Sequence, residues 1–287
     1  MEQLITLKSG NFSCTVSSIG AELISVKKGE RELIWQRDPA VWSGASPILF
    51  PICGGLKDDK YTYKGKEYSL PKHGFGRLVE FKFEKLSENE AVFFHSSNEE
   101  TMKSYPFKHE FKVTYRLEDG VLKVDYETAN TGNDTMYFSV GAHEGYSCPD
   151  GIEDYSVIFD EEEDFKINEL HGNLLGLDTA PLIPKGKELK LKEEYFKIDA
   201  LVFTSLKSRK VTLLNRKTES RITLSFPKHD YFLIWQKYGA KYICLEPWCG
   251  IPDFIGTGYD ISEKIGIMPL EAGKTDVRSH TIDFTNA

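Results

Sequence analysis

One glutamate stands in an otherwise apolar run of the chain, Tyr242-Ile-Cys-Leu-Glu-Pro-Trp248. The run is typical of a strand, and Pro247 removes the next backbone N–H, so we expect the strand to end at Glu246. A carboxylate in this position takes the proton of a hydroxyl group, while the ring of Trp248 stacks on the apolar CH groups of a sugar. The alternative is a strand-end glutamate that pairs with a nearby lysine.

Two histidines lie in segments that contain glycine. His143 ends an alternating stretch and falls on its polar face, with Ser139 and Gly141. His73 belongs to Lys72-His-Gly-Phe-Gly-Arg77, which is the pattern of neither a strand nor a helix. Because imidazoles titrate near neutral pH, both are candidates for proton transfer. The alternative for each is a structural or surface role, which we expect for the other histidines: His95, His109, His171, His229 and His280.

Apolar and polar residues alternate along the segments that must hold these side chains. The alternation continues on both sides of the turn Glu118-Asp-Gly120, from Phe111 to Leu117 and from Leu122 to Tyr126. A period of two on both sides of a turn predicts an antiparallel hairpin. Other short strands with turns between them follow, and helical patterns are few. We therefore predict an all-β fold, a large antiparallel β-sandwich with few short helices, in which residues 1–287 form a single domain. Three tryptophans are expected in its core: Trp35, Trp42 and Trp235.

The composition narrows the class of ligand. The 287 residues include 36 Lys and Arg against 44 Asp and Glu, for a net charge of −8 with no basic run. This balance argues against nucleic acid and anionic membranes as partners and favours a neutral small molecule. No apolar run approaches the roughly 20 residues that span a bilayer, and the first residues do not have the pattern of a secretory signal. The five cysteines form no C-x-x-C pair, so we expect a reduced, cytoplasmic protein without a metal site.

Three motifs in this order resemble those of the aldose 1-epimerases, the galactose mutarotase-like family. They are His73-Gly-Phe-Gly-Arg77, Gly141-Ala-His-Glu-Gly-Tyr146 and Glu246-Pro-Trp248. The first and third are typical of a branch of short bacterial members, and the resemblance covers nearly the whole chain. It implies the galactose mutarotase-like supersandwich, an isomerase that interconverts the α and β anomers of a hexose, and no cofactor.

The resemblance also implies roles for individual residues. Glu246 resembles the general base of the family, and His143 resembles its general acid. His73 resembles a second histidine that holds a sugar oxygen. Asp199 is similar to an aspartate that binds sugar hydroxyls, and Trp248 is expected beside the sugar. Ring opening needs the acid and the base on opposite sides of one pyranose, each with a pKa near the working pH.

One position departs from the family pattern. Many relatives carry a sugar-contacting arginine in the glycine-rich stretch where this chain has Gly55. Arg77 or Lys57 is a candidate to replace it in binding the substrate, and a different sugar is the other explanation.

Other functions remain open at this stage. A glycoside hydrolase needs a second carboxylate roughly 5–10 Å from Glu246, for which Glu144 or Asp253 is a candidate. A non-catalytic sugar-binding or sensing domain is compatible with the same fold. A hexose-6-phosphate epimerase needs a cationic pocket, with Lys57, Lys72 and Arg77 as the nearby cations. We expect a monomer or a homodimer.

Overall fold

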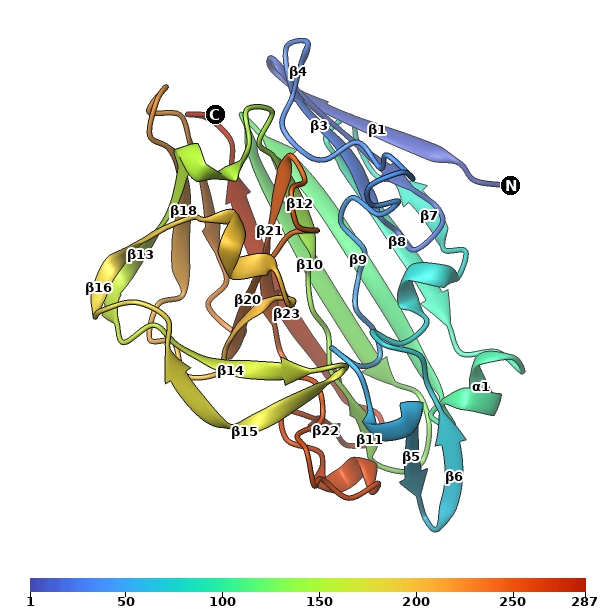
Figure 1. The fold of residues 1–287 in the computed structure, drawn as a ribbon. Coiled ribbons are helices and arrows are strands. Elements are labelled where there is room, and N and C mark those ends of the chain that lie inside the picture. The colour runs from blue at the N-terminus through green and yellow to red at the C-terminus, as the bar shows by residue number, and fades with distance from the viewer.

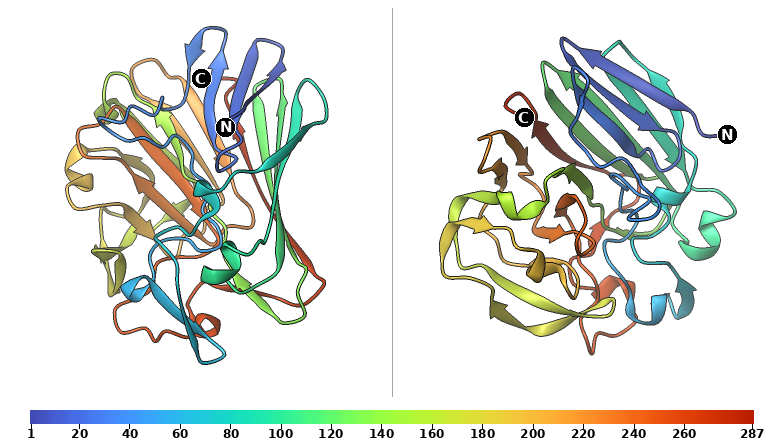
Figure 2. Two further views of the ribbon diagram at one scale, coloured as in Figure 1. Left: turned by 90° about the vertical axis from the view of Figure 1, so that its right-hand side faces the viewer. Right: turned by 45° about the horizontal axis from the view of Figure 1, so that its top comes forward.

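The computed structural model describes residues 1–287, and most of its ordered elements are antiparallel strands in two layers (Figures 1 and 2). The first layer is a nine-stranded sheet that runs the length of the molecule. Its strands, in spatial order, are β16 (Gly186–Lys190), β13 (Tyr155–Glu163), β18 (Lys210–Asn215), β19 (Arg221–Ser225), β23 (Thr275–Asp283), β10 (Val121–Asn130), β9 (His109–Glu118), β8 (Glu90–Ser96) and β7 (Lys82–Lys85).

Two smaller sheets form the second layer. The six-stranded sheet has the order β12 (Glu144–Ser147), β21 (Tyr242–Trp248), β20 (Tyr231–Trp235), β17 (Leu201–Phe203), β14 (Lys166–His171) and β15 (Leu174–Pro181). The four-stranded sheet has the order β1 (Leu4–Ser9), β2 (Phe12–Ser17), β3 (Leu23–Lys28) and β4 (Arg31–Glu32). Backbone hydrogen bonds from Trp35 to Gly145 and from Ser147 to Leu33 join the two sheets beside β12.

The remaining elements are short. Two further antiparallel pairs are the hairpin of β5 (Lys60–Tyr63) with β6 (Lys66–Ser69) and the pairing of β11 (Met136–Phe138) with the distant β22 (Met268–Leu270). The α-helix α1 covers Thr101–Ser104, and 3-10 turns cover Lys57–Asp59, Gly76–Leu78, Ile152–Asp154, Glu193–Phe196 and Ile261–Glu263. None of these helices has the length and apolar character that crossing a membrane requires. The predicted sandwich with few short helices is confirmed.

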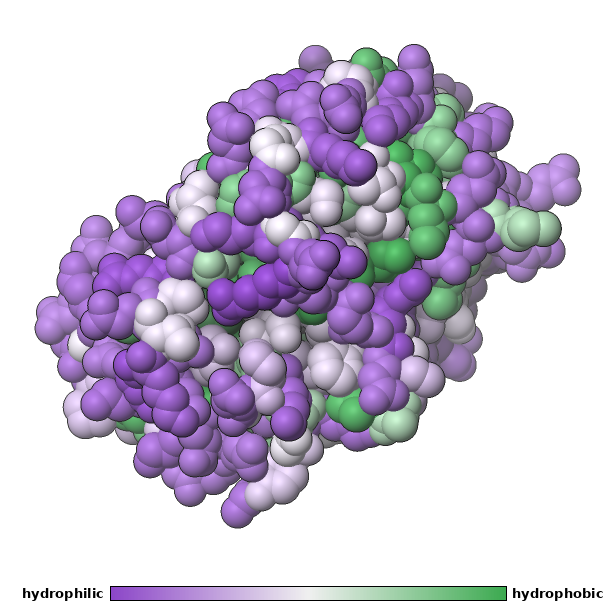
Figure 3. All heavy atoms as spheres, turned by 90° about the horizontal axis from the view of Figure 1, so that it is seen from above, coloured by the Kyte–Doolittle hydropathy of each residue, from purple (hydrophilic) through white to green (hydrophobic).

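The core lies between the layers, as the alternation predicted. In the hairpin of β9 and β10, Phe111, Val113 and Val124 are fully buried, while their polar neighbours point outward. Phe50 reaches into this layer and stacks on Phe111, with the ring centroids 4.1 Å apart. The largest of three apolar clusters extends from Ile5 to Phe284. The face seen from above is mostly hydrophilic, and hydrophobic residues show only in smaller areas (Figure 3).

The expected end of the strand at Glu246 is wrong, because β21 continues to Trp248. Pro247 is tolerated since its carbonyl accepts a hydrogen bond from the Ala142 N–H, on the side away from β20. The N–H and C=O of one strand residue point to the same side. The missing N–H therefore also faces Ala142, and the ladder to β20, where Pro247 lies opposite Phe232, is not broken. Glu246 thus lies within a paired strand of the sheet.

Candidate active site

A cavity of about 310 Å³ lies against the six-stranded sheet, within the size range of small-molecule sites. Six of the residues that line it are the residues predicted from the sequence: His73, Arg77, His143, Asp199, Glu246 and Trp248. The structure therefore brings together segments that are far apart in the chain. The other lining residues are Trp42, Pro47, Lys72, Leu170, Asn173, Ala200, Leu233, Trp235 and Pro252.

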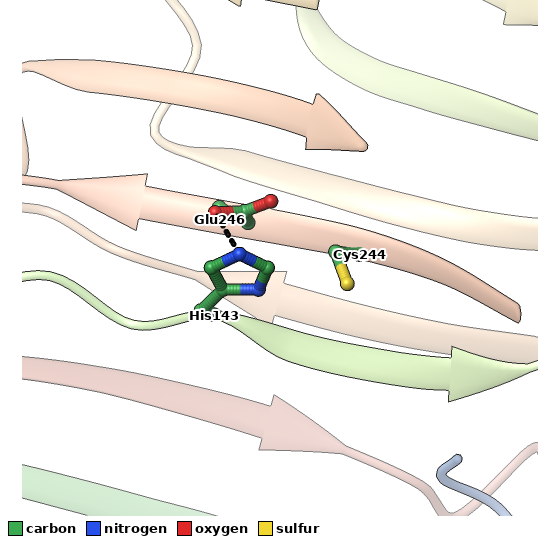
Figure 4. A group of neighbouring side chains, drawn as sticks. All are labelled: His143, Cys244 and Glu246. Carbon is green, nitrogen blue, oxygen red and sulfur yellow. Dashed lines mark ion pairs between the residues drawn. The ribbon is translucent and has the colours of Figure 1, made fainter. Parts of the chain in front are cut away.

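Two neighbouring strands present the proton-carrying candidates. Glu246 lies in β21, and His143 immediately precedes β12, which pairs with β21. The Nε2 atom of His143 lies 3.3 Å from Oε2 of Glu246 (Figure 4). His143 is 9 % exposed and Glu246 only 1 %. The two groups therefore contact each other. From the sequence we expected the opposite arrangement, with the acid and the base on either side of one pyranose.

Two glycines explain how His143 is held in position. Gly141, His143 and Gly145 alternate along one strand direction, so they share a face. A Cβ atom on Gly141 would lie 2.8 Å from the indole of Trp248, and one on Gly145 would lie 2.9 Å from the indole of Trp42. The missing side chains therefore let one indole pack against the backbone before His143 and another against the backbone after it. The Trp248 indole is fixed further by its N–H, which donates to the carbonyl of Ala142 at 3.1 Å.

His73 approaches the pair from a glycine-rich loop. Its ring centroid is 5.9 Å from that of His143 and 5.3 Å from that of Trp248. The Gly54 N–H donates to His73 Nδ1 at 3.1 Å, so in the neutral ring the proton is on Nε2. His73 also has a φ of 69°, a left-handed conformation that is uncommon for a residue with a side chain. Strain of this kind is found at functional sites, and it accompanies an Nε2–H that remains available to a ligand oxygen.

Burial dominates the titration of the three groups. It raises the pKa of Glu246 well above its ordinary value, an effect that the positive charge of Lys72 partly opposes. Burial lowers the pKa of His143 to about 3, and it lowers the pKa of His73 well below the ordinary value. Both imidazoles are therefore neutral at neutral pH. Burial therefore favours the form of the His143–Glu246 pair in which the carboxyl group, and not the imidazole, carries the proton.

Charged and polar groups stand further out in the cavity. Lys72, Arg77 and Asp199 line it and are all partly exposed. Burial lowers the pKa of Arg77 from its ordinary value. Lys57, the other cation considered from the sequence, is not among the lining residues; its ammonium lies over the ring of Tyr259 instead.

The position of Gly55 faces the turn between β14 and β15. A Cβ atom on Gly55 would lie 2.7 Å from Cβ of Asn173 and 3.0 Å from its carbonyl oxygen. Asn173 itself lines the cavity. The turn therefore fills the space that a side chain at position 55 would need, which explains in physical terms why glycine stands there. The sequence analysis missed Asn173, because nothing local marks this turn as part of a site.

Two expectations about the tryptophans need correction. Trp42 and Trp235 were expected in the core, but both line the cavity, with ring centroids 5.2 and 5.6 Å from that of His143. Trp235 lies opposite Cys244 in the register of β20 and β21, and Leu233 lies opposite Glu246. This register was the only signal that connects Trp235 with the site, and it requires knowing which strands pair.

The additional acids considered for a hydrolase lie elsewhere. Glu144 points to the opposite face of its strand and contacts His280 at 2.9 Å. Asp253 forms a buried ion pair of 2.7 Å with Lys264. Neither Glu144 nor Asp253 lines the cavity, so neither can be the second carboxylate that a hydrolase needs opposite Glu246. The five remaining histidines do not line it either, as expected.

Several known proteins are similar to this chain over most of its length. The family model described as aldose 1-epimerase matches residues 3–259. The protein LacX, plasmid, of Lactococcus lactis subsp. lactis is 32% identical over 300 residues, covering 98% of this chain and 99% of the relative. Among solved structures, a galactose mutarotase related enzyme from Lactobacillus acidophilus has a TM-score of 0.92 at 32% identity, covering 98% of this chain and 97% of the other. A galactose mutarotase-like protein from Lactobacillus casei ATCC 334 has a TM-score of 0.93 at 27% identity, covering 98% and 99%.

Proposed function

The chain belongs to the aldose 1-epimerase family, and from this premise we propose that it interconverts the α and β anomers of a hexose by general acid and base catalysis. The observation that carries the proposal is the buried contact of 3.3 Å between His143 and Glu246 at the wall of a sugar-sized cavity. The pair holds one proton, so it supplies one acid and one base at the same time.

The proposed reaction keeps protons and electron pairs in balance. Glu246 takes the proton of the C1 hydroxyl, and the C1–O1 bond becomes a carbonyl as the bond from C1 to the ring oxygen breaks. The ring oxygen keeps that electron pair and takes a proton from His143. Rotation about the C1–C2 bond exposes the other face of the carbonyl. The ring oxygen then attacks C1, His143 recovers its proton, and Glu246 returns its proton to O1.

The geometry is compatible with these roles although the two side chains touch. The C1 hydroxyl and the ring oxygen are both bonded to C1, so a contacting acid and base reach both of them at one edge of the sugar. In the empty cavity burial favours the proton on Glu246, and the proposed roles need it on His143. Oε2 and Nε2 are close enough for direct transfer once the sugar binds.

The other lining residues support the binding of a sugar. The Nε2–H of His73 is free to donate to a sugar oxygen, and Asp199 is an acceptor for hydroxyls at the same cavity. The indoles of Trp42, Trp235 and Trp248 provide apolar faces for CH groups. We propose that His73, Arg77, Asp199 and Trp248 bind the substrate.

Measuring anomer interconversion by polarimetry with freshly dissolved α-glucose and α-galactose tests the proposal. Glu246→Gln should lower kcat/KM by about 10²–10⁴-fold, because general acid and base catalysis contributes that much. The matched control is Glu84→Gln, an exposed carboxylate on β7, which should leave the rate unchanged. Sugar binding by the wild type without any acceleration of interconversion would support a binding or sensing domain and refute the epimerase.

A specific observation also favours a phosphorylated hexose as the substrate. Lys72 and Arg77 both line the cavity, and together they provide positive charge for a phosphate group. On this hypothesis glucose 6-phosphate is a better substrate than glucose, and Arg77→Gln raises KM for glucose 6-phosphate far more than KM for glucose. Equal KM effects on the two sugars would show that the substrate is not phosphorylated.

A further inference from the structure

A cysteine lies next to the acid–base pair. Cys244 precedes Glu246 by two residues in β21, so the two side chains point to the same face of the strand. One donor atom each of His143, Cys244 and Glu246 lies within 4.8 Å of the other two (Figure 4). Cys244 is not on the cavity wall; it is fully buried behind the wall, packed near Trp42 and Trp235.

Two polar atoms of this group lack partners. Oε2 of Glu246 and Nδ1 of His143 are buried and make no hydrogen bond, and the contact of 3.3 Å between the residues is not aligned as one. A buried polar atom without a partner is destabilising, and the large majority of such atoms are satisfied by protein groups, water or an ion. The unpartnered carboxylate oxygen of Glu246 therefore points to a ligand that the three residues share.

The donor set is the one that zinc prefers. Imidazole nitrogen, thiolate sulfur and carboxylate oxygen are the usual protein ligands of Zn²⁺, with bond lengths of about 2.0–2.3 Å. In a tetrahedron with bonds of this length, a nitrogen and an oxygen ligand are about 3.3 Å apart. The separation of Nε2 and Oε2 already has this value. The sulfur lies within 4.8 Å of the other two donor atoms, and a tetrahedral site needs about 3.6 Å, so it has to move by up to about 1.2 Å to complete the third corner.

We propose that His143, Cys244 and Glu246 form a binding site for a thiophilic divalent cation such as Zn²⁺, and that the ion inhibits the protein. The fourth position faces the cavity, where water or a sugar hydroxyl completes the shell. Binding takes the thiolate form of Cys244, so it releases the thiol proton to the solvent. His143 and Glu246 then both bind the ion, so neither can exchange a proton with a sugar. The inhibition rests on the proposed function, whereas the binding itself does not.

Direct binding is tested with Co²⁺, whose thiolate complexes show a charge-transfer band in the near ultraviolet. The wild type should show this band and lose it when Zn²⁺ is added. Cys244→Ala and Cys244→Ser should both lack the band, and circular dichroism establishes that they fold. The matched control is Cys14→Ala, which removes an equally buried thiol in β2 and should keep the band. Absence of the band in the wild type, or its persistence in both Cys244 variants, would overturn the site.

Inhibition is tested by anomer interconversion with and without Zn²⁺. The wild type and Cys14→Ala should lose activity, and Cys244→Ala should need at least about tenfold more zinc, because loss of even an outer partner of a ligand weakens metal binding about 10–100-fold. Equal zinc sensitivity of wild type and Cys244→Ala would overturn the inhibitory role. A cobalt band in a protein without epimerase activity would refute the proposed function alone, and activity without a band would refute the metal site alone.

Discussion

The single proton held between His143 and Glu246 is the property on which the proposed chemistry depends. Burial raises the pKa of the carboxyl group well above its ordinary value and lowers the pKa of the imidazole to about 3, so the pair holds one proton between the two. Burial disfavours the charged form of both groups. It shifts their pKa values in opposite directions, because the charged form is an anion in the carboxyl group and a cation in the imidazole. The pair therefore provides both functions without any nearby counterion in contact.

The pH dependence of the rate follows from these shifts. Below about pH 3 the pair gains a second proton and has no acceptor, and above the raised pKa of Glu246 it loses its only proton and has no donor. We expect kcat/KM to stay level between these limits, with the alkaline limb above the ordinary carboxyl pKa of 4.5. Because the charge of Lys72 lowers the pKa of Glu246, Lys72→Gln should move the alkaline limb to higher pH. A limb that stays in place or moves to lower pH in this variant would contradict the assignment of that limb to Glu246.

At the scale of elements, the turn between β14 and β15 forms one wall of the cavity. Asn173 at this turn lies so close to Gly55 that it occupies the space a side chain at position 55 would need. Backbone hydrogen bonds from Leu175 to Asp253 and from Ile255 to Leu175 fix the start of β15 against the loop after β21. The turn is therefore held in place, and a side chain at position 55 has to displace it.

Gly55→Ala should both destabilise the protein and weaken substrate binding. Overpacking of this kind typically costs about 1–3 kcal/mol, and displacement of Asn173 should raise KM for the sugar. Gly55→Ala combined with Asn173→Gly should recover part of both losses, because the second change removes the Cβ atom that the first one meets. Urea unfolding and KM measurements report the two effects. The matched control is Gly186→Ala, whose added methyl meets no atom within 4 Å and whose φ is not left-handed.

Strands and turns formed by neighbouring residues could be predicted from the sequence. The residues that line the cavity could be predicted only in part. The hairpin of β9 and β10 follows from alternation and a turn that are adjacent in the chain, so no distant partner is needed to recognise it. The motifs gave His73, His143 and Glu246. Trp42 could not be assigned, because it reaches Gly145 from a loop about one hundred residues earlier in the chain. Periodicity identifies strands, but it does not say which strand pairs with which. The expectation that Pro247 ends the strand failed for the same reason, because it depends on which neighbour the missing N–H faces.

At the scale of the whole molecule, a buried polar contact connects the two layers. Glu144 in β12 of the six-stranded sheet contacts His280 in β23 of the nine-stranded sheet, with Oε1 and Nε2 2.9 Å apart. Both side chains are buried, and the ring of His280 stacks on Tyr126 in β10. Because Glu144 follows His143 directly, this contact also ties the strand that carries the imidazole to the centre of the large sheet.

Removing both partners should destabilise the protein by much less than the sum of the two single removals. Glu144→Leu or His280→Leu alone leaves a buried polar group without its partner, which costs about 1–3 kcal/mol. The double variant Glu144→Leu with His280→Leu leaves neither group unpaired, so its loss should be well below the sum of the two single losses. Urea unfolding of the four proteins measures the free energy of unfolding of each. Additive losses would show that the two side chains stabilise the layers independently.

The burial of His143 and Glu246 does not prevent repeated turnover. Each proton that leaves the sugar in the proposed ring opening comes back to it when the ring closes, so substrate and protein finish a cycle with the protons they had at its start. Such a reaction needs no chain of water molecules or titratable side chains to carry protons between the buried site and the solvent. An acid and a base that are 9 % and 1 % exposed can therefore act repeatedly while the solvent outside takes no part in the exchange.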